Sequence, residues 1–192
     1  HDVIAIAELV DVEAETGAVT VASGNHVTVN DTAVEAATTI TITADTDGNG
    51  AGNVVMTAAA DLLAPTSTVT GSSVVIGQIA DDDADVTADI VTVTATHGVI
   101  TAADEAQTDI TANTVTLLAV NGIGTRPTIG AEAIDIDNAE SIVARTTGGN
   151  SGEIFVNSRN LDNNDVQVWM STRGDDADIT LNSLTGGLLM LQ

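Results

Sequence analysis

Apolar and polar residues alternate along many short segments of this chain. Residues 39–43 (TITIT), 90–94 (IVTVT) and 178–182 (DITLN) show this two-residue period most clearly. The period is typical of a β-strand that buries one side, and β-branched residues such as Val, Ile and Thr favour strands over helices. Residues 58–64 come closest to a helical pattern, and Pro65 would end such a helix. The pattern therefore predicts an all-β protein.

One ten-residue pattern recurs at a constant separation. Its copies begin at Asp61, Asp85 and Asp109, so that each copy starts 24 residues after the one before. A repeat of this length is too short for a sandwich domain and fits one coil of a solenoid. We expect a parallel β-helix of about eight coils, each of roughly 24 residues. This single β-helix segment should cover residues 1–192.

Two columns of residues continue through the whole chain at nearly the same spacing. The apolar column is expected to stack inside the solenoid and consists of Val19, Ile42, Val69, Val93, Leu117, Val143, Val168 and Leu191. Eight residues before each member lies a column rich in Asp and Asn, which consists of Asp11, Val34, Asp61, Asp85, Asp109, Asp135, Asn160 and Ser183. We predict that the five residues of the apolar column from Val69 to Val168 are all buried, each above the last.

The chain is strongly acidic. It contains 28 Asp and Glu residues against four Arg and no Lys, which gives a formal net charge of −24. Such a chain repels phosphate backbones and anionic membrane surfaces, so nucleic-acid binding is excluded and cations are the natural partners. No apolar run approaches the length of a membrane span, so no membrane insertion is expected. The absence of cysteine fits either the cytosol or a bacterial surface.

One short segment resembles a metal-binding loop. Asp45, Asp47 and Asn49 stand at alternate positions and precede Gly50, as in the first half of a calcium loop. The twelfth position holds Met56 in place of the bidentate Glu, so the motif is incomplete. The alternative is a solvated turn that Asp, Asn and Gly residues close. Calcium bound by Asp45, Asp47 and Asn49 is the only cofactor that the sequence suggests.

No catalytic motif is evident. His26 and His97 have no second ligand at metal-binding spacing, and neither a Gly-x-Ser-x-Gly motif nor a phosphate-binding loop occurs. Two Asp residues could serve a glycoside hydrolase, but a lyase would need a basic partner in a chain with four scattered Arg. We therefore expect no enzyme activity. Trp169 follows Val168 and should face outward, where it could contact a sugar, another subunit or a neighbouring loop.

Several phrases resemble the filamentous-haemagglutinin-like repeats of giant bacterial surface adhesins. They are residues 91–95 (VTVTA), 97–101 (HGVIT), 109–117 (DITANTVTL), 121–125 (NGIGT) and 147–156 (TGGNSGEIFV). The resemblance extends from about Thr38 to the end of the chain and implies a right-handed parallel β-helix that is secreted and displayed as a long fibre. It carries no catalytic motif across. Haloarchaeal surface-layer proteins are also acidic and Thr-rich, and composition does not separate the two.

These observations favour an extracellular, cell-surface fibre segment that acts as a rigid spacer and interaction surface. The apolar segments 3–7 and 188–191 lack an evident cap. The expected partners are therefore neighbouring coils of a longer fibre or head-to-tail copies, with surface glycans as a further candidate. The first alternative function is a filament or surface-layer subunit that stacks end to end. A carbohydrate-active β-helix enzyme is the second alternative.

Overall fold

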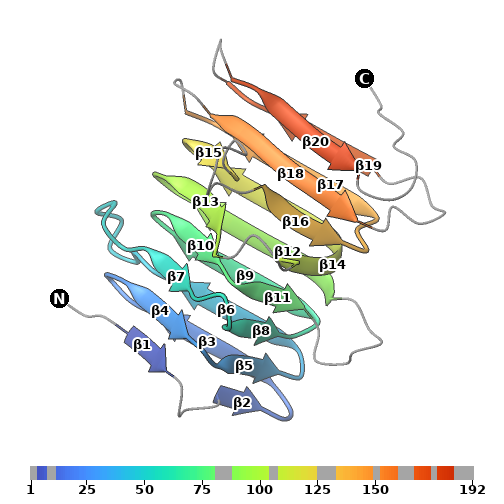
Figure 1. The fold of residues 1–192 in the computed structure, drawn as a ribbon. Coiled ribbons are helices and arrows are strands. Elements are labelled where there is room, and N and C mark those ends of the chain that lie inside the picture. The colour runs from blue at the N-terminus through green and yellow to red at the C-terminus, as the bar shows by residue number, and fades with distance from the viewer. Residues whose placement is uncertain are drawn as a thin grey trace.

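The computed structural model describes residues 4–7, 12–80, 88–103, 108–124, 133–148, 152–159, 167–173 and 177–183. This part of the chain contains strands and no helix. Every strand pairing is parallel and joins strands of successive coils, as the ordered colours along the stack show (Figure 1). The protein is therefore a β-solenoid, which confirms the predicted all-β parallel fold.

Each coil has three faces. The first face contains β1 (Ile4–Ala7), β4 (Val27–Asn30), β7 (Val54–Met56), β10 (Val74–Ile76), β13 (Val99–Ala102) and β15 (Gly122–Ile123). The second face contains β2 (Val12–Ala14), β5 (Ala33–Ala36), β8 (Asp61–Leu63), β11 (Gln78–Ala80), the start of β14 (Ile110–Ala119) and β16 (Ile134–Asp137). The third face contains β3 (Ala18–Ala22), β6 (Thr39–Thr43), β9 (Thr66–Gly71), β12 (Ala88–Ala95), the rest of β14, β17 (Ser141–Thr146) and β19 (Gln167–Ser171).

The first and second faces merge towards the C-terminal end. β18 (Glu153–Arg159) pairs with β15 through its first residues and with β16 through its last ones. β20 (Ile179–Ser183) then pairs along the length of β18. The third face keeps its separate strands through the same coils, so its sheet is the most regular wall of the solenoid.

The number of turns is slightly lower than expected. The third face has seven strands from β3 to β19, and these strands mark about six full turns rather than about eight coils. Insertions between strands are one cause, because they make some coils longer than others. Ala18 pairs with Thr39, and Thr39 pairs with Thr66, which lies 27 residues further along the chain. With strands about 4.8 Å apart, six turns make a stack about 30 Å long.

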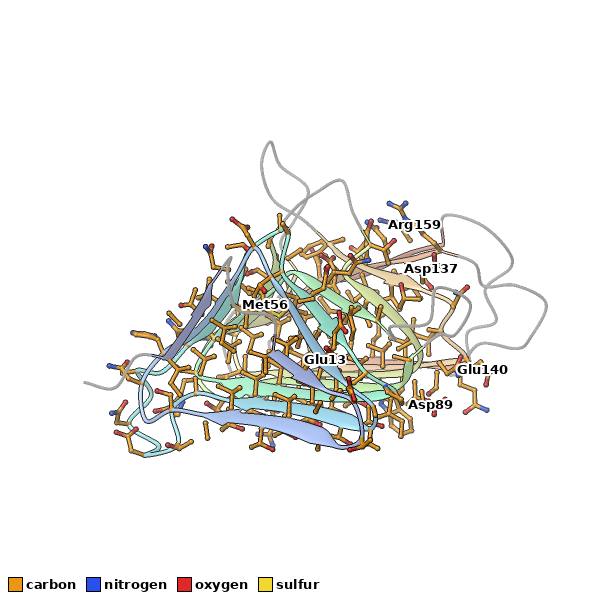
Figure 2. All side chains as sticks on the ribbon, turned by 90° about the horizontal axis from the view of Figure 1, so that it is seen from below. Glu13, Met56, Asp89, Asp137, Glu140 and Arg159 are labelled. Carbon is orange, nitrogen blue, oxygen red and sulfur yellow. The ribbon has the colours of Figure 1, made fainter. Side chains whose placement is uncertain are left out.

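Aliphatic side chains fill the interior. Alternate residues of each strand point inward, and Ile40, Ile42, Val69, Val93 and Leu117 are fully buried. Most of them stack on aliphatic residues of the next coil, whereas Ile40 stacks on the buried Ser67. The core is therefore a narrow, mainly aliphatic column enclosed by three walls. Side chains fill the space between the walls in the view along the stack (Figure 2).

The predicted apolar column is correct in its middle and wrong at its ends. Ile42, Val69, Val93 and Leu117 stack in register. The next residue is Ala144, whereas Val143 pairs with Thr116 on the outer side of the wall. One extra residue in the coil causes this shift, because a slip of one position moves a side chain to the opposite side of a strand.

Three other members of the predicted column have different positions. Val19 pairs with Ile40, and Val168 pairs with Ile142 and is only partly buried. Both therefore belong to a second inward row, two residues away from the predicted one. The spacing could not distinguish the two rows, because both are apolar. Leu191 lies outside the described residues.

The polar column also shifts where the coil length changes. Asp61, Asp109 and Asp135 occupy corresponding positions at the start of the second-face strands. Ala33, rather than Val34, pairs with Asp61, and Gln78 takes the place predicted for Asp85. Asn157 takes the place predicted for Asn160. Asp11, Asp85 and Asn160 themselves lie outside the described residues. Ser183 pairs with Ser158, so that Asn182 rather than Ser183 pairs with Asn157.

Candidate functional site: an uncharged threonine face

The outward side chains of the third face form three parallel rows. The first row is Ala18, Thr39, Thr66, Ile90, Thr114, Ser141 and Gln167. The middle row is Thr20, Thr41, Thr68, Thr92, Thr116, Val143 and Trp169, and the third row is Ala22, Thr43, Thr70, Thr94, Leu118, Arg145 and Ser171. Because Thr is the commonest residue in these rows, we call this surface the threonine face.

The threonine face carries almost no charge. None of its positions holds Asp or Glu, and Arg145 is its one charged residue, although the chain contains 28 acidic residues. Asp89 and Glu140 are exposed and lie at the edge of the face, just before the first row. Figure 2 shows both residues at one corner of the lower wall. Negative charge is therefore placed beside this face and not on it.

The face is regular and rigid. Neighbouring strands lie about 4.8 Å apart, and outward residues along one strand are about 6.7 Å apart. The threonines from Thr39 to Thr116 are half-buried between their neighbours, and a β-branched side chain has few accessible rotamers. Fully buried residues such as Val69 and Val93 support the wall from inside. The wall that carries these threonines is nearly straight in the view along the stack (Figure 2). Its outward side is a lattice of hydroxyl and methyl groups.

The C-terminal end of the face differs in chemistry. Trp169 lies next to Val143 in the middle row and is 73% exposed, so it faces outward as expected. Ile90 in the first row is also exposed, but it lies on β12 in the middle of the face. A run of threonines in the first five coils thus gives way to one large aromatic side chain.

The predicted calcium loop lies between β6 and β7. Asp45 has a φ of 59°, and both of its carboxylate oxygens accept the Gly50 backbone N–H, at 3.0 and 3.1 Å. Asp47 accepts the side-chain amide of Asn49 at 2.7 Å, while Asn49 Oδ1 accepts the Ala51 backbone N–H at 2.8 Å. The three predicted ligands are therefore close in the loop and engaged in its own hydrogen bonds. Calcium binding here remains a prediction.

The two histidines discussed above lie in separate turns. His97 Nδ1 lies 3.0 Å from Thr96 Oγ1 and 3.7 Å from Asp45 Oδ2. His26 Nδ1 accepts the Asn53 backbone N–H at 3.1 Å. The His26 imidazole therefore links its turn to the turn of the next coil, whereas His97 lies near the Asp45 loop of the coil two before its own. Within the described ranges, no three His, Cys, Asp or Glu residues form a metal-binding group.

Polar side chains form a hydrogen-bonded ladder along the second face. Asp109 Oδ2 accepts the Asp135 backbone N–H at 2.7 Å. Asp135 accepts the Asn157 amide at 2.6 Å and the Arg159 guanidinium at 2.8 Å. Asn157 Oδ1 in turn accepts the amide of Asn182 at 2.9 Å. The acids of the predicted polar column thus bind backbone and side-chain donors of the next coil.

The ladder limits repulsion between its carboxylates. Two carboxylates about 5 Å apart repel by about 0.8 kcal/mol even in water. Asp109 and Asp135 are nearly fully buried, and Arg159 places a positive charge beside the second of them. Burial also raises the pKa of Asp61, which pairs with Ala33 and Gln78 rather than with another acid. These contacts indicate a structural role for the ladder.

Sequence reasoning assigned the threonines to strands but missed the surface that they form. The signal was present as Thr-x-Thr in residues 39–43, 66–70, 92–94 and 114–116. Its meaning depends on the register, which places every one of these threonines outward on the same wall. The sequence reasoning also missed the pairing of Arg159 with Asp135.

Comparison of the chain with protein-family models, with curated proteins and with solved structures gives no match. A search of the described residues for a helix long and apolar enough to cross a membrane finds none.

Proposed function

We propose that this chain is a rigid β-solenoid segment of an extracellular, cell-surface fibre, and that its threonine face is the adhesive surface. One observation carries this proposal. In a chain of net charge −24, none of the outward positions in the three rows of this face holds an acidic residue, and the exposed Asp89 of β12 lies just before the first row. Charge at the other faces and corners keeps the segment soluble, while the uncharged face can approach another surface.

The shape of the face supports an extended ligand over a small molecule. A flat lattice has no concave pocket in which to enclose a small ligand, and enclosure is the usual source of small-molecule affinity. Many weak contacts made at once by a rigid surface give strong attachment without any single strong contact. The partner is therefore a neutral, extended surface, with glycans of a cell surface as one candidate.

A binding assay on coated surfaces tests this proposal. Beads carrying the full chain are applied to neutral polysaccharide, ice and bare hydrophilic polymer, and their retention under flow is measured. We expect retention on at least one surface, and its loss in a Thr68→Lys, Thr92→Lys double variant. The matched control is Thr28→Lys with Thr101→Lys, because both residues point outward on the first face. Equal retention of the two double variants, or no retention of the native chain, would exclude the threonine face as an adhesive surface.

The second candidate is a subunit that stacks end to end. Within the described residues, β3 pairs only with β6, and β19 pairs only with β17. An adjacent coil from a longer chain or from another copy could pair with either outer edge. Electron microscopy of the purified chain distinguishes separate rods from continuous filaments.

A further inference from the structure

The threonine face has the properties of a surface that matches another lattice. Its middle row places a threonine in five successive coils, from Thr20 to Thr116. The flanking rows add threonines on both sides in two of these coils, at Thr39 and Thr43 and at Thr66 and Thr70. They add a threonine on one side in two more, at Thr94 and Thr114. The positions therefore repeat in two directions, about 4.8 Å between strands and about 6.7 Å along them.

A surface that repeats in two directions makes its largest number of simultaneous contacts only with a ligand that is also periodic. A molecule of ordinary size would contact two or three of these side chains, whereas a crystalline surface can contact all of them at once. Backbone pairing on both sides and β-branched side chains hold the threonines in place before contact. Little conformational entropy is then lost on binding, and weak contacts add together.

The chemistry of the face selects among periodic surfaces. An ionic mineral would require charged contacts, and the acidic residues of this chain lie beside the face rather than on it. Crystalline polysaccharides are held largely by stacking on aromatic rings, and Trp169 is the one aromatic residue on this face, at its end. Two copies that stacked face to face would bury rows of hydroxyl groups, which is costly unless each finds a partner.

Ice fits the remaining requirements. It is a neutral lattice in which every water molecule both donates and accepts hydrogen bonds, and a threonine hydroxyl does the same. The threonine methyl group can occupy the openings between water molecules at an ice surface. The separation of the strands is also close to the oxygen repeat along one axis of ordinary ice.

We propose that the threonine face binds ice, with the threonines of the central coils as the contact residues. This inference rests on the proposed function, because it names the extended neutral surface that the face holds. The ordered lattice is the ligand, so binding depends on the whole array and on its flatness. A single bulky, charged side chain in the middle row lifts the surrounding threonines away from the ice and removes many contacts together.

Ice partitioning and ice-crystal growth test the inference on the full chain. A solution of the chain is frozen slowly onto a cold probe, and the fraction of protein included in the ice is measured. Thermal hysteresis and crystal shape are recorded by nanolitre osmometry on the same samples. We expect the native chain to enter the ice and to shape the crystals, and Thr92→Lys to reduce inclusion by about tenfold or more.

Two further variants separate surface chemistry from folding. Thr101→Lys on the first face should leave inclusion in ice unchanged, and circular dichroism must show both lysine variants folded. Thr92→Ser and Thr92→Val then remove the methyl and the hydroxyl group separately, and each should weaken inclusion less than Thr92→Lys. Light scattering reports whether the native chain pairs through this face instead.

The outcomes distinguish the two proposals. Exclusion of the native chain from ice, together with Thr68- and Thr92-dependent retention on polysaccharide, would overturn ice binding and leave the adhesive surface in place. If the native chain is neither included in ice nor retained on any of the surfaces, both ice binding and the adhesive function are overturned. A face-to-face dimer that Thr92→Lys dissociates would also overturn ice binding, because the same residues would then be covered in solution.

Discussion

Arg159 donates a hydrogen bond of 2.8 Å from Nη2 to Oδ2 of Asp135, across the boundary between two coils. The Asp135 side chain is 9% exposed, whereas the Arg159 side chain is 40% exposed. The guanidinium therefore reaches from solvent to a nearly buried carboxylate. This contact joins β18 to β16 where the first and second faces merge.

Removal of Arg159 should destabilise the C-terminal coils. Arg159→Ala leaves the Asp135 carboxylate buried with one fewer donor, and we expect a loss of about 1–3 kcal/mol in the free energy of unfolding, since the arginine is partly exposed. Arg173→Ala is the matched control, because Arg173 is exposed at the end of β19. Urea denaturation measures both variants. Equal stability of the two would mean that the Asp135–Arg159 pair contributes nothing.

The inward and outward positions of the third face can be tested by truncation. Leu117→Ala should cost about 2–5 kcal/mol, because it opens a cavity in a fully buried row. Val143→Ala should cost about 1 kcal/mol or less, since Val143 points outward on the same wall. Chemical denaturation gives both values. A larger loss at Val143 than at Leu117 would contradict the register between β14 and β17.

Asp61 should make stability depend on pH in an unusual direction. Burial raises the pKa of this carboxyl above its ordinary value of 3.8, so the folded state binds its proton more tightly than the unfolded state does. The contribution of Asp61 to the free energy of unfolding is therefore most favourable below pH 3.8, and it is lost as the pH rises through the raised pKa. Asp61→Asn should raise the melting temperature at pH 7, with a difference that shrinks as the pH falls towards 3.8.

Asp89→Asn is the control for the Asp61 variant, because Asp89 is exposed at a corner of the solenoid. Its melting temperature should follow that of the native chain across the same pH range, apart from a small general effect of net charge. Melting curves that are shifted equally by Asp61→Asn and Asp89→Asn at every pH would exclude the burial of Asp61 as the cause.

Calcium should stabilise the chain beyond its effect on ionic strength. The loop of Asp45, Asp47 and Asn49 places several oxygen atoms close together in a strongly acidic protein. We expect millimolar Ca²⁺ to raise the melting temperature more than NaCl of matched ionic strength does. Asp47→Asn should abolish the excess, because it removes one charged ligand. The same rise with both salts would show that the acidic loops respond only to screening.

Local pattern alone predicted the class of this fold. The alternation in residues such as 39–43 depends only on which side of a strand is buried, and the 24-residue period of the repeat corresponds to one coil along Val69, Val93 and Leu117. The stacking of Ile42, Val69, Val93 and Leu117 followed from the same spacing and is confirmed. In a solenoid, each coil contacts mainly its neighbours, so repeated sequence maps directly onto repeated structure.

Register across the irregular coils was decided only by the tertiary structure. An insertion moved Val143 to the outer side of its wall, and a coil shorter than the expected one brought Gln78 into the place expected for Asp85. The sequence alone determined that strands stack in a solenoid, because alternation and period are local properties. Which threonines share one outward face, and which arginine reaches Asp135, depend on pairings between residues more than twenty positions apart, and only the folded coils establish those pairings.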